Sequence, residues 1–163
     1  MAQFATQAVT GGAQGVLAWM LDDTSYDGFT CGMWKAKKDG YALRPWFSVW
    51  GLLTRSFPAG SIFATVPAPA PGVEVLAARL PGVPERWAFC ITNAGTVSVT
   101  FRLRVPGAPD AVLDRYVYAD GPAKSDADGF PLPSDRAKVS PDAGWEVSCP
   151  EGGVVFLVPG DRP

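Results

Sequence analysis

The sequence predicts a mainly β protein, an antiparallel β-sandwich preceded by a short β-loop-α segment. Three observations predict this fold. The 163 residues include 18 glycines and 16 prolines, which favours many short elements joined by tight turns. After residue 61, short apolar runs alternate with turn residues at regular intervals, as is typical of a sandwich. Before that point, one unbroken apolar run precedes a polar loop and an amphipathic helix. We therefore expect two parts, residues 1–60 and residues 61–163.

The first part is predicted to contain a helix end, a strand, a loop and a second helix. Residues 4–9 have the spacing of the last turns of a helix, which the two following glycines end. Residues 15–21 are nearly all apolar without alternation, which is typical of a strand buried on both faces. After a polar loop over residues 24–40, Pro45 suits the first turn of a helix. The apolar stripe of this helix consists of Trp46, Val49, Trp50, Leu53 and Phe57.

The second part is predicted to be all strands and loops. Its strongest hairpin signal joins residues 87–92 to residues 97–105 through the turn at residues 93–96. Apolar and polar side chains alternate along residues 97–105, so one face of this strand should meet a core and the other should meet water. Further strands are expected at residues 73–80, 112–118, 145–148 and 154–158, an extended connector at residues 66–72, and a loop at residues 119–142.

Charge and hydropathy exclude several classes of function. With 14 basic and 16 acidic side chains the formal net charge is −2, so the chain lacks the basic surface that nucleic-acid or anionic-membrane binding needs. The longest apolar run, residues 16–21, is far shorter than the roughly 20 residues of a membrane span. No basic region precedes an apolar stretch at the start, so we expect no signal peptide, and the compartment stays open.

The chemistry available to the side chains is also restricted. The chain contains no histidine, which removes Ser-His-Asp and Cys-His catalysis and histidine-ligated zinc. Cys31, Cys90 and Cys149 lie far apart and form no C-x-x-C pair, so neither a zinc site nor a dithiol redox motif is predicted. Cys90 lies in an apolar run and should be buried. We expect no metal and no cofactor.

Five short motifs follow one another in the first part: residues 15–23, 32–34, 38–40, 44–47 and 57–61. Together they resemble the end of the barrel of clan A glycoside hydrolases. In those retaining enzymes, a strand carrying a tryptophan is followed by a loop of the type G-x-W…D-G…R/K-P-x-(F/Y) and then by the last barrel helix. The rest of the chain resembles the β-sandwich that many of these enzymes carry after the barrel. The resemblance implies that residues 1–60 are the terminal strand, loop and helix of a (β/α)₈ barrel.

The same resemblance implies that the chain lacks the catalytic residues. Retaining glycosidases use two carboxylates about 5–5.5 Å apart, and in clan A both are glutamates near the ends of the fourth and seventh barrel strands. No glutamate precedes Glu74 here, so neither has a counterpart and we expect no catalytic residue. A barrel needs roughly 250 residues, more than this chain contains. The parent would be a glycosidase, and this chain a C-terminal piece of it.

The candidates for substrate binding are three tryptophans and two aspartates. The resemblance places Trp19 on the eighth barrel strand, where the family's tryptophan stacks on the sugar. Trp34 and Trp145 are the other candidates for stacking, whereas Trp46, Trp50 and Trp87 are expected in the core. Asp22 and Asp23 end the apolar strand, where barrel active sites lie. Neighbours on a strand point to opposite faces, so a concerted acid/base role is not predicted, and capping of the following loop is the alternative.

We therefore expect a non-catalytic C-terminal region of a glycoside hydrolase that supports the catalytic barrel. One alternative is a carbohydrate-binding module that uses exposed aromatic side chains. Another is a subunit or fragment that acts only in association with the missing barrel. Residues 15–21 and 46–57 would otherwise expose an apolar surface and an unpaired strand. The isolated chain is therefore predicted to self-associate through them or to fold its first strand onto the sandwich.

Overall fold

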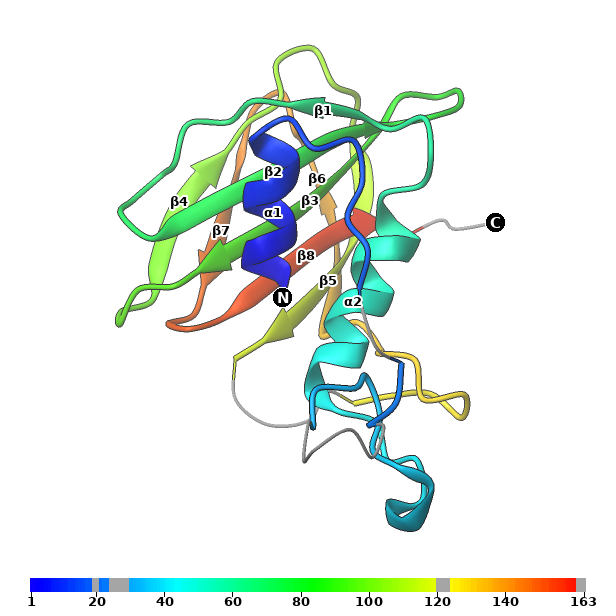
Figure 1. The fold of residues 1–163 in the computed structure, drawn as a ribbon. Coiled ribbons are helices and arrows are strands. Elements are labelled where there is room, and N and C mark those ends of the chain that lie inside the picture. Colours follow the sequence, from blue (N-terminus) through cyan, green and yellow to red (C-terminus); the bar gives the residue numbers. More distant parts are fainter. Residues whose placement is uncertain (19–20, 24–29, 120–123, 161–163) are drawn as a thin grey trace.

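The computed structural model describes residues 1–18, 21–23, 30–119 and 124–160 (Figure 1). Within these residues the chain is mainly β, and all of its paired strands are antiparallel. The predicted fold class, mainly β with an antiparallel sandwich, is therefore confirmed. In chain order the elements are α1 (Ala2–Thr10), the short 3-10 helix η1 (Lys37–Asp39), α2 (Pro45–Ser56), β1 (Ile62–Ala64), β2 (Val73–Leu80), β3 (Arg86–Asn93), β4 (Val99–Leu103), β5 (Ala111–Tyr118), β6 (Asp135–Val139), β7 (Trp145–Cys149) and β8 (Val154–Pro159).

The molecule has three layers (Figure 1). A six-stranded sheet in the order β1-β2-β3-β8-β5-β6 forms the middle layer, and the two strands β4 and β7 pair in a second, smaller sheet. The helices α1 and α2 cover the other face of the large sheet, where Leu52 and Leu53 of α2 are buried against Leu76 of β2 and Phe156 of β8. Each face of the large sheet therefore has its own hydrophobic core.

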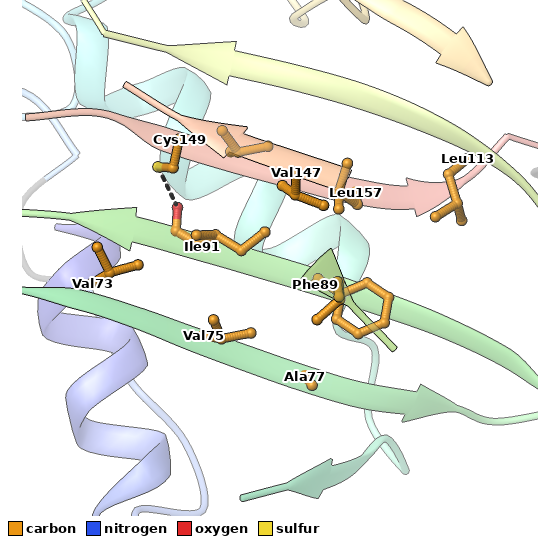
Figure 2. Packing of buried hydrophobic residues seen from close by; sticks show 11 residues of the cluster. Val73, Val75, Ala77, Phe89, Ile91, Leu113, Val147, Cys149 and Leu157 are labelled. Carbon is orange, nitrogen blue, oxygen red and sulfur yellow. Dashed lines mark hydrogen bonds between the residues drawn. The ribbon is translucent and has the colours of Figure 1, made fainter. Parts of the chain in front are cut away.

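The core between the two sheets explains the alternation in the predicted strands (Figure 2). Val73, Val75 and Ala77 of β2 and Phe89 and Ile91 of β3 point into it, and all are at most 3% exposed. The two-stranded sheet contributes buried side chains from β4 and β7, among them Leu103, Val147 and Cys149. Thr100, Arg102 and Arg104 face water, as the pattern predicted for residues 97–105.

The predicted hairpin between residues 87–92 and 97–105 is wrong. β3 pairs with β2 and β8, whereas β4 pairs with β7 in the other sheet. The buried side chain of Asn93 explains the change of sheet: its Nδ2 donates to the carbonyl oxygens of Val97 (2.9 Å) and Pro150 (3.0 Å), and its Oδ1 accepts from Gly95 N (2.9 Å). The turn thus carries the chain across the sandwich.

The predicted strand over residues 15–21 is also not found. Its described residues form neither helix nor strand, and only the adjoining Asp22 makes an isolated parallel bridge, with Trp34. A strand buried on both faces belongs to a sheet that is covered on both sides, and none of the strands in the described part of the chain pairs with residues 15–18 or 21. A helix does form over Ala2–Thr10, as the spacing of residues 4–9 predicted, and α2 begins at Pro45 as expected.

One strand lies where a loop was predicted. β6 falls within residues 119–142 and pairs with β5. Four of its five residues are exposed and three are charged, so it lacks the apolar alternation that marks a strand. Charged side chains are typical of strands at the edge of a sheet, and β6 is an edge of the large sheet. None of the helices in the described residues is both long and apolar enough to cross a membrane.

Candidate functional site

The loop before α2 is organised around the carboxylate of Asp23. Its Oδ2 accepts a hydrogen bond from Arg44 Nη2 at 2.5 Å, and its Oδ1 accepts one from the backbone N–H of Gly32 at 2.9 Å. The Arg44 guanidinium is the main reason why the pKa of Asp23 lies below its ordinary value of 3.8. One oxygen thus holds the loop at Gly32 and the other joins it to the residue that precedes α2, which supports the loop-capping interpretation of Asp23.

Backbone pairing places Trp34 beside the two aspartates. The Trp34 N–H donates to the carbonyl of Leu21 at 3.0 Å, and the Asp23 N–H donates to the carbonyl of Trp34 at 3.1 Å. Gly32 makes this approach possible, because a Cβ there would lie 2.3 Å from the backbone carbon of Asp22. A glycine in the G-x-W motif is therefore required by packing against the opposite backbone.

The structure brings Asp22, Asp23 and Trp34 together. All three are half-buried, and the Trp34 ring meets Phe47 of α2 edge to face, with centroids 6.2 Å apart. Trp19, which the resemblance places on the same strand as the aspartates, lies outside the described residues. Asp22, Asp23 and Trp34 form a polar and aromatic corner next to the start of α2.

Trp145 is not part of this corner. It lies on β7, where its ring meets Phe89 of β3 edge to face at 5.8 Å. It packs against the core between the two sheets, whereas α2, which carries the partner of Trp34, covers the opposite face of the large sheet. The candidates from the two parts of the sequence therefore lie on different faces of the molecule.

The charge state of Asp23 limits what the corner can do chemically. A carboxylate that Arg44 and Gly32 hold in its ionised form has no proton to give near neutral pH. The thiols of Cys90 and Cys149 are free, but burial raises their pKa values to about 12 and about 11, so neither is a ready nucleophile. No three histidine, cysteine, aspartate or glutamate side chains in the described ranges gather closely enough to hold a metal ion.

Sequence reasoning gave no role to Arg44. It is the partner that fixes the acid of the corner, and its backbone N–H also donates to the Met33 carbonyl at 2.9 Å. The signal was present in the Arg-Pro pair at the start of the helix, which the motif contains. The sequence does not indicate which acidic side chain pairs with this arginine, because Arg44 and Asp23 are 21 positions apart.

The fold occurs in a known class of proteins, the clan A glycoside hydrolases. The structure of this chain is similar to part of the solved glycoside hydrolase family 30 subfamily 8 xylanase from Clostridium acetobutylicum, with a TM-score of 0.71 and 14% identity. The match covers 96% of this chain and 36% of the xylanase. The family 30 endoxylanase from Clostridium papyrosolvens matches 78% of this chain with 30% of its own, a TM-score of 0.58 and 17% identity. No protein-family model and no curated protein matches the sequence. The chain spans about a third of these xylanases, and at this identity the likeness shows the fold alone.

Proposed function

We propose that this chain is a non-catalytic C-terminal region of a glycoside hydrolase, which completes and supports a catalytic barrel. One observation carries the proposal: the match to the Clostridium acetobutylicum xylanase takes in 96% of this chain, and therefore both of its parts, but only 36% of the xylanase. The likeness thus extends through the loop and helix before the sandwich.

The surface of the first part supports the same proposal. The Leu17 side chain is 82% exposed and that of Leu21 is 57% exposed, although both belong to the most apolar run of the chain. Exposure of several large apolar side chains in one segment is typical of a surface that another element covers. Neighbouring barrel strands would cover this segment, whether they belong to the same polypeptide or to a partner.

The absence of hydrolysis by the chain alone tests the proposal directly. We expect no release of nitrophenol from aryl β-xylosides and no reducing ends from xylan. Turnover by the purified chain that Asp22→Asn or Asp23→Asn removes would overturn the proposal. The reading frame upstream of Met1 supplies a second test: the proposal expects barrel strands with two glutamates there or in a co-expressed gene, and a neighbourhood without either would contradict it.

A further inference from the structure

An open hollow lies at one end of the sandwich, on the side of the large sheet that faces the smaller sheet. The antiparallel order brings the beginnings of β3 and β5 and the end of β8 to the same end of the large sheet. The connection before β5 and Pro141 close the hollow from the side of the smaller sheet. Its volume is about 310 Å³, within the range of small-ligand pockets.

One wall of the hollow is a fixed aromatic surface. Trp87 is half-buried and its ring stacks on Phe89, with an interplanar angle of 14° and centroids 6.3 Å apart. The indole N–H of Trp87 donates to Glu85 Oε1 at 2.8 Å, which holds the ring in one orientation. Phe89 in turn rests edge-on against Trp145. The Trp87 ring is therefore preorganised, and a ligand that stacks on it would restrict few protein side chains on binding.

The rim of the hollow carries charged groups whose hydrogen-bonding capacity is largely unused. Among the described residues, the side chain of Asp110 makes a long ion pair, 3.9 Å to Lys138, and is 57% exposed. Glu85 uses one oxygen for Trp87, and its other oxygen lies 3.9 Å from Arg79. Arg86 also lines the hollow. Carboxylates accept hydrogen bonds from neighbouring hydroxyl groups, and a guanidinium donates to hydroxyl and ring oxygens.

From this arrangement we infer that the hollow binds a neutral pyranose unit of an oligosaccharide or polysaccharide. The apolar C–H face of the sugar stacks on Trp87, and its hydroxyl groups bond to Asp110, Glu85 and Arg86. Each of the two carboxylates has a cation nearby, Lys138 for Asp110 and Arg79 for Glu85, so the charges around the hollow nearly balance and suit a neutral sugar. The inference does not require the proposed function, because the hollow is built entirely from residues of the sandwich and its connections.

The test is a titration of the whole chain with xylohexaose, cellohexaose, mannohexaose and, as the anionic comparison, hexagalacturonate. The readout is the shift of the indole N–H resonances in two-dimensional NMR, with calorimetry for the affinity. We expect saturable binding of at least one neutral hexaose, with the Trp87 resonance moving most. Failure of all neutral sugars to bind at millimolar concentration, or preference for hexagalacturonate, would overturn the inference.

Variants separate the hollow from the rest of the surface. Asp110→Ala should weaken binding about fivefold to tenfold, as expected for the loss of one hydrogen bond, and Trp87→Ala should abolish it. Asp128→Asn, a change of an exposed acid in another loop, is the matched control and should leave the affinity unchanged. Trp87 also packs against the core, so Trp87→Ala could fail to fold. In that case the affinity of Asp110→Ala alone tests the inference. An affinity that Asp110→Ala does not alter would contradict the assignment.

Discussion

At the scale of single residues, the loop before α2 depends on two contacts that differ in kind. Gly32 is required by space, because backbone atoms of Asp22 and Asp23 occupy the volume that a side chain would need. Asp23 is required by charge, because its carboxylate joins Gly32 to Arg44. Each contact makes a separate prediction about the loop.

The change Gly32→Ala should destabilise the chain by about 1–3 kcal/mol, as overpacking usually does, because the new methyl group would lie 2.3 Å from the backbone of Asp22 and force one of the two backbone segments to shift. Urea unfolding followed by fluorescence measures the effect. Gly15→Ala is the control, since nothing lies within 4 Å of a Cβ there and the free energy of unfolding should stay within about 0.5 kcal/mol. Equal effects of the two changes would contradict the close approach.

Asp23 predicts a dependence on pH. A carboxyl group whose folded pKa lies below its unfolded value of 3.8 stabilises the folded loop above that value, and this stabilisation is lost as the pH falls through the folded pKa. The Gly32 amide resonance should therefore titrate with a midpoint below 3.8. The step should disappear in Asp23→Asn and persist in Asp22→Asn. A midpoint at or above 3.8 would show that Arg44 does not hold the carboxylate.

At the scale of elements, most helices and strands could be predicted from local pattern, but their partners could not. The alternation in β4 and the stripe in α2 follow from periods of two and 3.6 residues that burial imposes. The turn at residues 93–96 signals only that the chain reverses, and it says nothing about which sheet receives the next strand. β6 escaped prediction because an exposed edge strand has no apolar face.

Only the part of the candidate site whose residues are close in the sequence could be predicted. Asp22, Asp23 and Trp34 meet because a short loop connects them, so the motif that contains them was informative. Trp145 was chosen for its residue type alone, and the fold packs it, partly buried, against the core between the sheets. Trp87 was assigned to the core because it opens a strand; it does pack against that core, but the strand's end leaves it only partly buried. The position of a residue within a strand does not show which end of the sandwich other elements leave uncovered.

The hydrogen bonds of Asn93 lead to a prediction about the stability of the turn that carries the chain from one sheet to the other. Its side chain is 2% exposed and holds Val97, Gly95 and Pro150 together. Asn93→Ala should cost about 2–4 kcal/mol, because several buried polar groups lose their partner at once. Chemical denaturation measures it. Thr100→Ala removes an exposed hydroxyl contact to Ser148 and should cost less than about 1 kcal/mol. If the two costs were equal, Asn93 would not hold the crossing.

At the scale of the whole molecule, the two helices and the large sheet form one unit with an apolar segment beside it. Val16 and Val9 pack against the core beneath the helices, whereas Leu17 and Leu21 are exposed to solvent. The helices thus belong to the sandwich by their packing, while this segment keeps an apolar surface. The segment is the feature of the isolated chain most open to association.

Association through this segment gives the fourth prediction. Sedimentation of the purified chain should show self-association that increases with concentration, and Leu17→Asp should weaken it at least about tenfold. Val97→Asp alters an equally apolar side chain, 65% exposed, on the crossing between the sheets and should leave the association unchanged. A chain that stays monomeric at all concentrations, or one that both changes affect equally, would contradict the prediction.

The position of β8 has a consequence for how the chain emerges from the ribosome. β8 is the last strand along the sequence, yet it lies between β3 and β5 and pairs with both. Until residue 159 has been synthesised, no strand connects β3 to β5, and the apolar side chains that β8 covers stay exposed in the nascent chain. The large sheet therefore stays divided until β8 has left the ribosome, and a premature stop codon before β8 would leave two separate halves rather than a slightly shortened sheet.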